Sequence, residues 1–148
     1  MIEEKPPDGY HRHPNGGGLV ADTAHVDLIA YVGPSARVEG HAYVFGSTRV
    51  SGGARVFGDA CVSGGARVSG GARVFGGQWD ESPPYIQVGP WSATESSPGH
   101  VTIGCTTMTI EDWLGEDGAA LADREAADPR HIRMLRAWMS ALAEERSR

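Results

Sequence analysis

Apolar positions repeat every six residues through the first half of the chain. Valine recurs in this way without a break, and a small residue stands two positions before each valine after the first. The valines are Val20, Val26, Val32, Val38, Val44, Val50, Val56, Val62, Val68 and Val74. The small residues are Ala24, Ala30, Ala36, Ala42, Thr48, Ala54, Ala60, Ala66 and Ala72. Residues two apart on a strand share a face, so both sets are expected to point into one core.

A period of six fits neither an α-helix nor one long strand. Glycine occupies the second position after valine from Gly40 through Gly76, where its conformational freedom suits a corner between short strands. Three short strands and three corners make a triangular coil of about eighteen residues. Residues 20–79 therefore predict about three stacked coils, spaced about 4.8 Å apart and covered at both ends.

The pattern Val-x-Gly-x-Ala-x resembles the hexapeptide repeat of left-handed parallel β-helix proteins, a superfamily that includes many acyltransferases and the γ-class carbonic anhydrases. The resemblance implies a left-handed β-helix and a homotrimer. The stretch Val101-Thr102-Ile103-Gly104-Cys105, followed by Thr109-Ile110-Glu111-Asp112-Trp113, is similar to the tail of uncharacterised hexapeptide-repeat proteins of phages and prophages. This second resemblance implies a phage- or prophage-encoded protein.

Outside the repeat, the pattern predicts three further parts of a mainly β protein. Pro- and Gly-rich residues 1–19 predict a loop or lid. Tyr85–Val88 and Val101–Cys105 are rich in β-branched residues and predict a hairpin extension within residues 80–108. Residues 109–148 are expected to form a helical cap.

Two helix starts are visible in that cap. Thr109 with Asp112 three residues later resembles a capping box, and Asp128-Pro129 is a typical helix start. The second helix carries an apolar face made of Ile132, Leu135, Met139 and Leu142. This face is expected to pack on the open end of the β-helix or on the same helices of neighbouring subunits.

Charge and composition limit the classes of partner that the protein is expected to bind. The formal net charge is −6, yet residues 20–79 hold five arginines against four acidic residues. A general nucleic-acid-binding protein is normally strongly basic, so that class is not expected, whereas a small anionic ligand is. No secretory signal and no membrane span is visible, and two cysteines make no disulfide framework. A cytoplasmic protein without a membrane partner is the expectation.

The residues before each valine are expected to point outward and to line up in three columns. The first column is Arg37, Arg55 and Arg73; the second is Tyr31, Arg49 and Arg67; the third is His25, Tyr43, Cys61 and Trp79. Phe57 and Phe75 follow valines beside the first column, together with Glu39. Arginine suits phosphate and carboxylate, and an exposed aromatic strip is typical of an interface.

The columns favour a non-catalytic protein that binds an anionic, nucleotide-like ligand. The two resemblances imply that this protein is a homotrimer and that a host defence protein is a further possible partner. The predicted binding residues are Arg37, Arg55, Arg73, Arg49, Arg67, Tyr31, Tyr43, Phe57 and Phe75. Two alternatives stay open: an acyltransferase that uses acyl-CoA with His25 or His41 as base, and a structural assembly unit. Otherwise no cofactor is expected, and His11, His13 and His25 lack the ligand spacing of a metal site.

Overall fold

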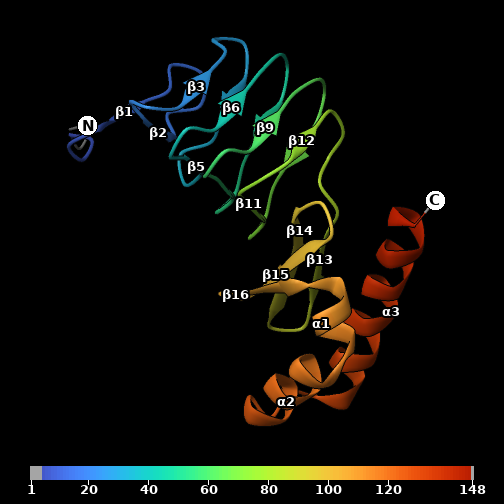
Figure 1. The fold of residues 1–148 in the computed structure, drawn as a ribbon. Helices are drawn as coiled ribbons and strands as arrows, with labels where there is room; N and C mark the ends of the chain where they lie inside the picture. Colours follow the sequence, from blue (N-terminus) through green and yellow to red (C-terminus); the bar gives the residue numbers. More distant parts are fainter. Residues whose placement is uncertain (1–4, 148) are drawn as a thin grey trace. The chain divides into compact units, whose positions relative to one another are not determined.

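The computed structural model describes residues 5–147. The chain divides between Pro83 and Pro84 into two compact units, called here the solenoid unit and the C-terminal unit. Short strands dominate the first unit, and a sheet with three helices forms the second (Figure 1). No helix in the described part of the chain has the length and apolar character needed to cross a membrane.

Parallel strands of two or three residues wind the solenoid unit into about three coils, which confirms the predicted parallel β-solenoid. Their bounds are β2 (Leu19–Ala21), β3 (His25–Val26), β4 (Tyr31–Val32), β5 (Arg37–Val38), β6 (Tyr43–Val44), β7 (Arg49–Val50), β8 (Arg55–Val56), β9 (Cys61–Val62), β10 (Arg67–Val68), β11 (Arg73–Val74) and β12 (Gln78–Trp79). Three sheets result, in the orders β2-β5-β8-β11, β4-β7-β10 and β3-β6-β9-β12. Each sheet is one wall of the solenoid.

The core of the solenoid is the valine and alanine set that the repeat predicts. Every one of these valines except Val26 is at most 1% exposed, and Thr48 is buried in the place of an alanine. Thr48 satisfies its hydroxyl by donating to the carbonyl of Phe45 at 2.7 Å. The corners hold glycines in the left-handed region, of which Gly58 at φ 61° is an example.

The N-terminal segment covers one end of the solenoid and is more ordered than the predicted loop. Strand β1 (Tyr10–Arg12) pairs antiparallel with β2, so a hairpin closes the outer edge of that sheet. The backbone of Asn15 accepts a hydrogen bond from Val32 at 3.0 Å, which satisfies the edge of β4. His13 is buried, and its Nε2 lies 2.7 Å from the Ala30 carbonyl oxygen.

At the other end of the solenoid, the last strand does not follow the six-residue repeat. Strand β12 pairs with β9 so that Trp79 lies beside Val62 and Gln78 beside Cys61. Trp79 thus takes the inward position of a valine, is 8% exposed, and donates its indole N–H to the Gly76 carbonyl at 2.8 Å. The prediction that Trp79 belongs to the outward third column is wrong, because the last step is one residue short.

The C-terminal unit begins with a four-stranded antiparallel sheet rather than with the predicted hairpin. Its strands are β13 (Tyr85–Val88), β14 (Trp91–Ser97), β15 (His100–Ile103) and β16 (Thr106–Thr109), paired in sequence order. The two predicted strands both exist but are not neighbours, because β14 lies between them. The polar residues of β14, expected to form a loop, are instead buried in the middle of the sheet.

Helices α1 (Ile110–Leu114), α2 (Glu116–Arg124) and α3 (Pro129–Arg146) complete the C-terminal unit. Thr109 caps α1 by accepting from the Asp112 N–H at 3.1 Å, and Asp128 caps α3, as the sequence predicts. The apolar face of α3 packs within its own unit: Leu135 and Met139 join a core with Val101 and Trp113. The buried part of this face therefore packs on the sheet and on α1 of its own unit. Packing on the helices of neighbouring subunits stays a prediction.

A buried ion pair ties the end of α3 to β14. The side chain of Glu95 is fully buried and accepts from Arg146 at 2.7 and 2.5 Å and from the Gly99 N–H at 2.9 Å. The hydrogen bond that Arg146 donates to Glu95 raises the pKa of Arg146 above its ordinary value. Because an unpaired carboxylate is costly to bury, this pair fixes α3 against the sheet.

Candidate functional site: the outward walls of the solenoid

The wall made by β2, β5, β8 and β11, called here the first wall, carries the first arginine column. Arg37, Arg55 and Arg73 lie in register on successive strands, as the eighteen-residue period predicts. Glu39 lies between two of them: its carboxylate accepts from Arg55 at 2.6 Å and is 3.7 Å from the Arg37 guanidinium. Two arginines of this column are thus already engaged by a carboxylate of the chain.

The electrostatics of Glu39 reflect these partners. Burial raises the pKa of the Glu39 carboxyl, but the hydrogen bond and charge of Arg55, the Tyr10 hydroxyl at 3.3 Å and the charge of Arg37 outweigh that effect. The pKa therefore lies below its ordinary value, and Glu39 is ionised at neutral pH.

An aromatic strip runs beside this column. The rings of Phe57 and Phe75 lie 5.9 Å apart and are tilted by 39°, and the Arg55 guanidinium lies 5.6 Å from the centre of the Phe57 ring. Both phenylalanines remain half-buried at the surface of the unit. The structure thus brings Arg55, Phe57 and Phe75 together as predicted, with Glu39 as the counter-ion of Arg55.

The wall made by β4, β7 and β10, called here the second wall, holds the second column. Tyr31, Arg49 and Arg67 lie in register on its three strands. The Arg49 guanidinium lies over the Tyr31 ring, 4.5 Å from its centre. Arg49 and Arg67 are exposed, and no carboxylate among residues 5–147 lies within 4 Å of either guanidinium. Two stacked cations on this wall therefore lack the counter-ion that the first wall has.

The third wall, made by β3, β6, β9 and β12, is aromatic. His25 stacks on Tyr43 with ring centres 5.0 Å apart, and Tyr43 lies 5.5 Å from Phe45. Tyr43 and Phe45 are 41% and 36% exposed. Cys61 and Gln78 complete this column, with Gln78 in the place predicted for Trp79.

The two candidate base histidines are both exposed, and neither pairs with a carboxylate of residues 5–147. His25 uses its ring to stack on Tyr43, and His41 lies at a corner where its backbone N–H donates to Gly58. In the described part of the chain, the one histidine paired with a carboxylate is His11, whose Nδ1 lies 2.8 Å from Asp22. Groups of three or more possible metal ligands are likewise lacking among the described residues.

Glu39 is the residue of these walls whose role the sequence left open. Its place after Val38 puts it on the same wall as Arg37 and Arg55, so a carboxylate beside an arginine column was a readable signal. Its pairing with the arginine of the next coil required the register of β5 and β8, which only the folded coil supplies.

Comparisons with protein-family models, with curated proteins and with solved structures gave no match for this chain.

Proposed function

We propose that this protein is a non-catalytic homotrimeric binding protein whose second wall holds an anionic, phosphate-bearing ligand. The observation that carries the proposal is the contrast between the two arginine columns. On the first wall Glu39 contacts two guanidinium groups from successive coils, whereas Arg49 and Arg67 have no such carboxylate among the described residues. An external anion would supply the same counter-charge.

The geometry of the second wall favours phosphate. Parallel neighbours in a sheet are about 4.8 Å apart, so one phosphate can accept hydrogen bonds from both guanidinium groups. Ser51 and Ser69 follow the valines of the same strands and add hydroxyl groups. The Tyr31 ring, over which the Arg49 guanidinium now lies at 4.5 Å, becomes a stacking surface for a nucleotide base when Arg49 turns to the phosphate. A nucleotide or cyclic dinucleotide combines these features.

The aromatic side chains support the trimer. Phe57 and Phe75 on the first wall, and Tyr43 and Phe45 on the third, form apolar strips that a neighbouring copy would cover. In keeping with the hexapeptide-repeat resemblance, we propose a left-handed solenoid whose flat walls meet in the trimer. The phage-like layout adds a host defence protein as a second class of partner for the same arginine walls.

Calorimetry tests the ligand. Titration of ATP, GTP and cyclic dinucleotides should give saturable binding that weakens with added salt. Arg49→Gln and Arg67→Gln should each weaken binding at least tenfold, because each removes one of two cations that share the phosphate. Arg37→Gln is the matched control: it also removes one exposed arginine, but one that Glu39 already engages, and it should change binding less than twofold. Lack of nucleotide binding, or equal effects of the three substitutions, would refute the ligand proposal.

Sedimentation tests the assembly. A trimer is expected, and Phe75→Glu should convert it to monomers by burying a charge in the apolar contact. A wild-type monomer would contradict the trimer, whereas filaments would support a structural assembly unit. Turnover of acetyl-CoA that is lost in His25→Ala or His41→Ala would instead support the acyltransferase alternative.

A further inference from the structure

A cavity of about 710 Å³ lies within the C-terminal unit. Its lining is mainly apolar and includes Trp91, Ile103, Trp113, Leu121, Ile132 and Met139. These residues come from β14, β15 and all three helices. The volume falls in the range of sites that hold small molecules, about 300–1,000 Å³.

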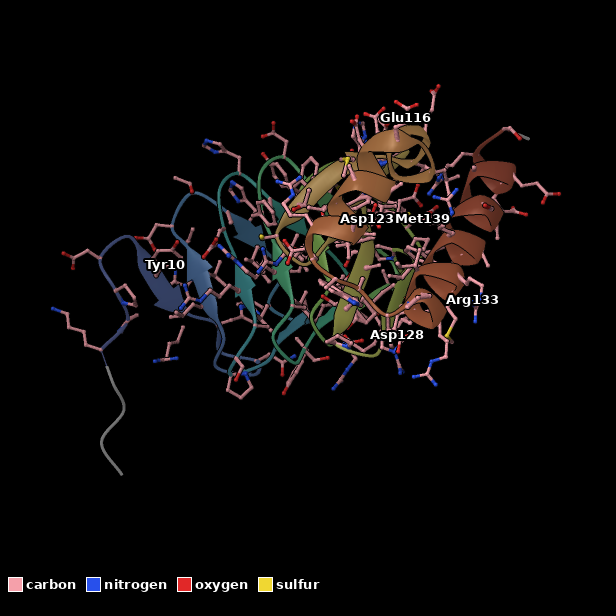
Figure 2. The ribbon with its side chains drawn as sticks, turned by 90° about the horizontal axis from the view of Figure 1, so that it is seen from below. Tyr10, Glu116, Asp123, Asp128, Arg133 and Met139 are labelled. Atoms are coloured by element: carbon pink, nitrogen blue, oxygen red, sulfur yellow. The ribbon has the colours of Figure 1, made fainter. Side chains whose placement is uncertain are left out.

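The packing of α2 explains why the cavity exists. Gly118 lies against α1 so closely that an added Cβ would fall 1.9 Å from the Trp113 carbonyl oxygen. Helix α2 packs along α1, and no close packing of α2 along α3 is found in the described chain. Of the apolar α3 side chains in the lining, Ile132 is therefore only partly covered, whereas Leu135 and Met139 form the buried floor. Figure 2 shows Glu116 and Asp123 on α2 and Met139 on α3, three residues of the lining.

The charged residues of the lining indicate which charge a bound ligand should carry. Three carboxylates line the cavity, those of Glu116, Asp123 and Glu125, against one guanidinium, that of Arg136. Arg136 donates to the Leu114 carbonyl at 2.8 Å, at the C-terminal end of α1, so part of its charge is already balanced. None of the three carboxylates forms an ion pair within the described residues.

We infer that this cavity binds a hydrophobic small molecule that carries one positive charge. The indole rings of Trp91 and Trp113 favour an aromatic or cationic ligand body, because a tryptophan face attracts a cation. The carboxylates of the lining attract a cation and repel an anionic ligand of the same shape. The site is independent of the arginine walls, and it adds a second ligand class to the protein.

Two probes of equal shape and opposite charge test the inference. Tetraphenylphosphonium and tetraphenylborate are titrated into the full chain, with calorimetry as the readout. The phosphonium should bind at least tenfold more tightly than the borate. Ala119→Trp, at an exposed position of the lining, should abolish binding of the phosphonium by filling the cavity. Ala122→Trp, also in the lining, is the second filling variant if the first does not fold.

A matched pair of triple variants isolates the carboxylates. Glu116→Gln, Asp123→Asn and Glu125→Gln together should reduce the preference for the phosphonium at least fivefold. Glu111→Gln, Asp112→Asn and Asp117→Asn change the charge of the unit equally outside the lining and should leave the preference within twofold.

Equal binding of both probes, or equal effects of both triple variants, would overturn the charge assignment. Failure of both probes to bind, or binding of the phosphonium that survives a folded filling variant, would overturn the cavity as a ligand site. A filling variant that changes the oligomeric state instead would also overturn it, since the cavity would then be an interface between copies.

Discussion

Glu39 shows how one carboxylate organises a wall of stacked cations. It binds Arg55 directly and lies within reach of Arg37, although these arginines are 40% and 50% exposed. Exposed ion pairs contribute little to stability because water and salt screen them. The main effect of Glu39 is therefore to balance part of the positive charge of the first wall, whereas Arg49 and Arg67 on the second wall have no ion-pair partner among residues 5–147.

The lowered pKa of Glu39 predicts a pH-dependent contribution to the stability of the solenoid. A carboxyl whose folded pKa is lowered stabilises the fold fully above its unfolded value of 4.5, and this contribution is lost as the pH falls through the folded value. The difference between wild type and Glu39→Gln should be below about 1 kcal/mol at pH 7. It should shrink on acidification below pH 4.5. Hydrogen exchange of residues 20–79 at pH 7 and pH 3.5 measures it, and a difference that does not change with pH would contradict the assignment.

The two positions of a glycine corner differ, and the first of them is left-handed at every corner from Gly40 through Gly70. Gly58 has φ 61°, and an added Cβ would fall 2.5 Å from the Phe75 carbonyl oxygen of the next coil. Gly65 has no left-handed angle, and an added Cβ would meet nothing within 4 Å. Only the first type of position requires glycine, because there both the backbone angle and the stacking of coils exclude a side chain.

This asymmetry predicts opposite outcomes for two identical substitutions. Gly58→Ala should destabilise the solenoid by at least about 1–2 kcal/mol, the cost of a left-handed residue with a side chain. Gly65→Ala should be neutral or stabilise it by up to about 1 kcal/mol, because it restricts the unfolded chain. Urea unfolding of both variants measures the difference. Similar losses of stability would mean that the corner conformation has been assigned wrongly.

At the scale of elements, the sequence predicted the strands that follow the six-residue repeat. It did not predict the elements that depend on residues far apart in the chain. The unbroken valine series predicted the strands, the core and the order of the columns. The one-residue shortening before Trp79 left no local mark, since a tryptophan at that place also reads as an outward aromatic. Strand β14 was missed because its polar residues resemble a loop. Glu95 is buried there only because Arg146, 51 residues later, neutralises it.

For the whole molecule, a solenoid must protect the strands at its ends. The hairpin of β1 with β2 and the contact of Asn15 with Val32 cover two of the three N-terminal edges. Trp79 fills the core at the opposite end. Uncovered strand edges pair with other chains, so these end structures limit association of the solenoid with further copies.

Removal of the N-terminal cover should therefore change association. Deletion of residues 1–17 removes β1 and Asn15, and it should produce species larger than those of the full chain that grow with concentration. Deletion of residues 1–6 leaves β1 in place and is the control, which should sediment like the full chain. Sedimentation velocity over a range of concentrations distinguishes the two. Equal sedimentation of both deletions would show that other contacts limit association.

Because the strands of each wall are in register, the solenoid can be lengthened without rearranging its walls only by whole coils of eighteen residues. A duplication of eighteen residues, such as 38–55, would add one rung and lengthen every column by one member without changing which wall any later residue occupies. A duplication of six would preserve the valine core equally well but rotate all later residues to the next wall, placing arginines where aromatic residues stood. Insertions of six residues during evolution can therefore keep the fold while changing which residues lie on each wall. Only insertions of eighteen residues, or multiples of eighteen, keep both the fold and the composition of the walls.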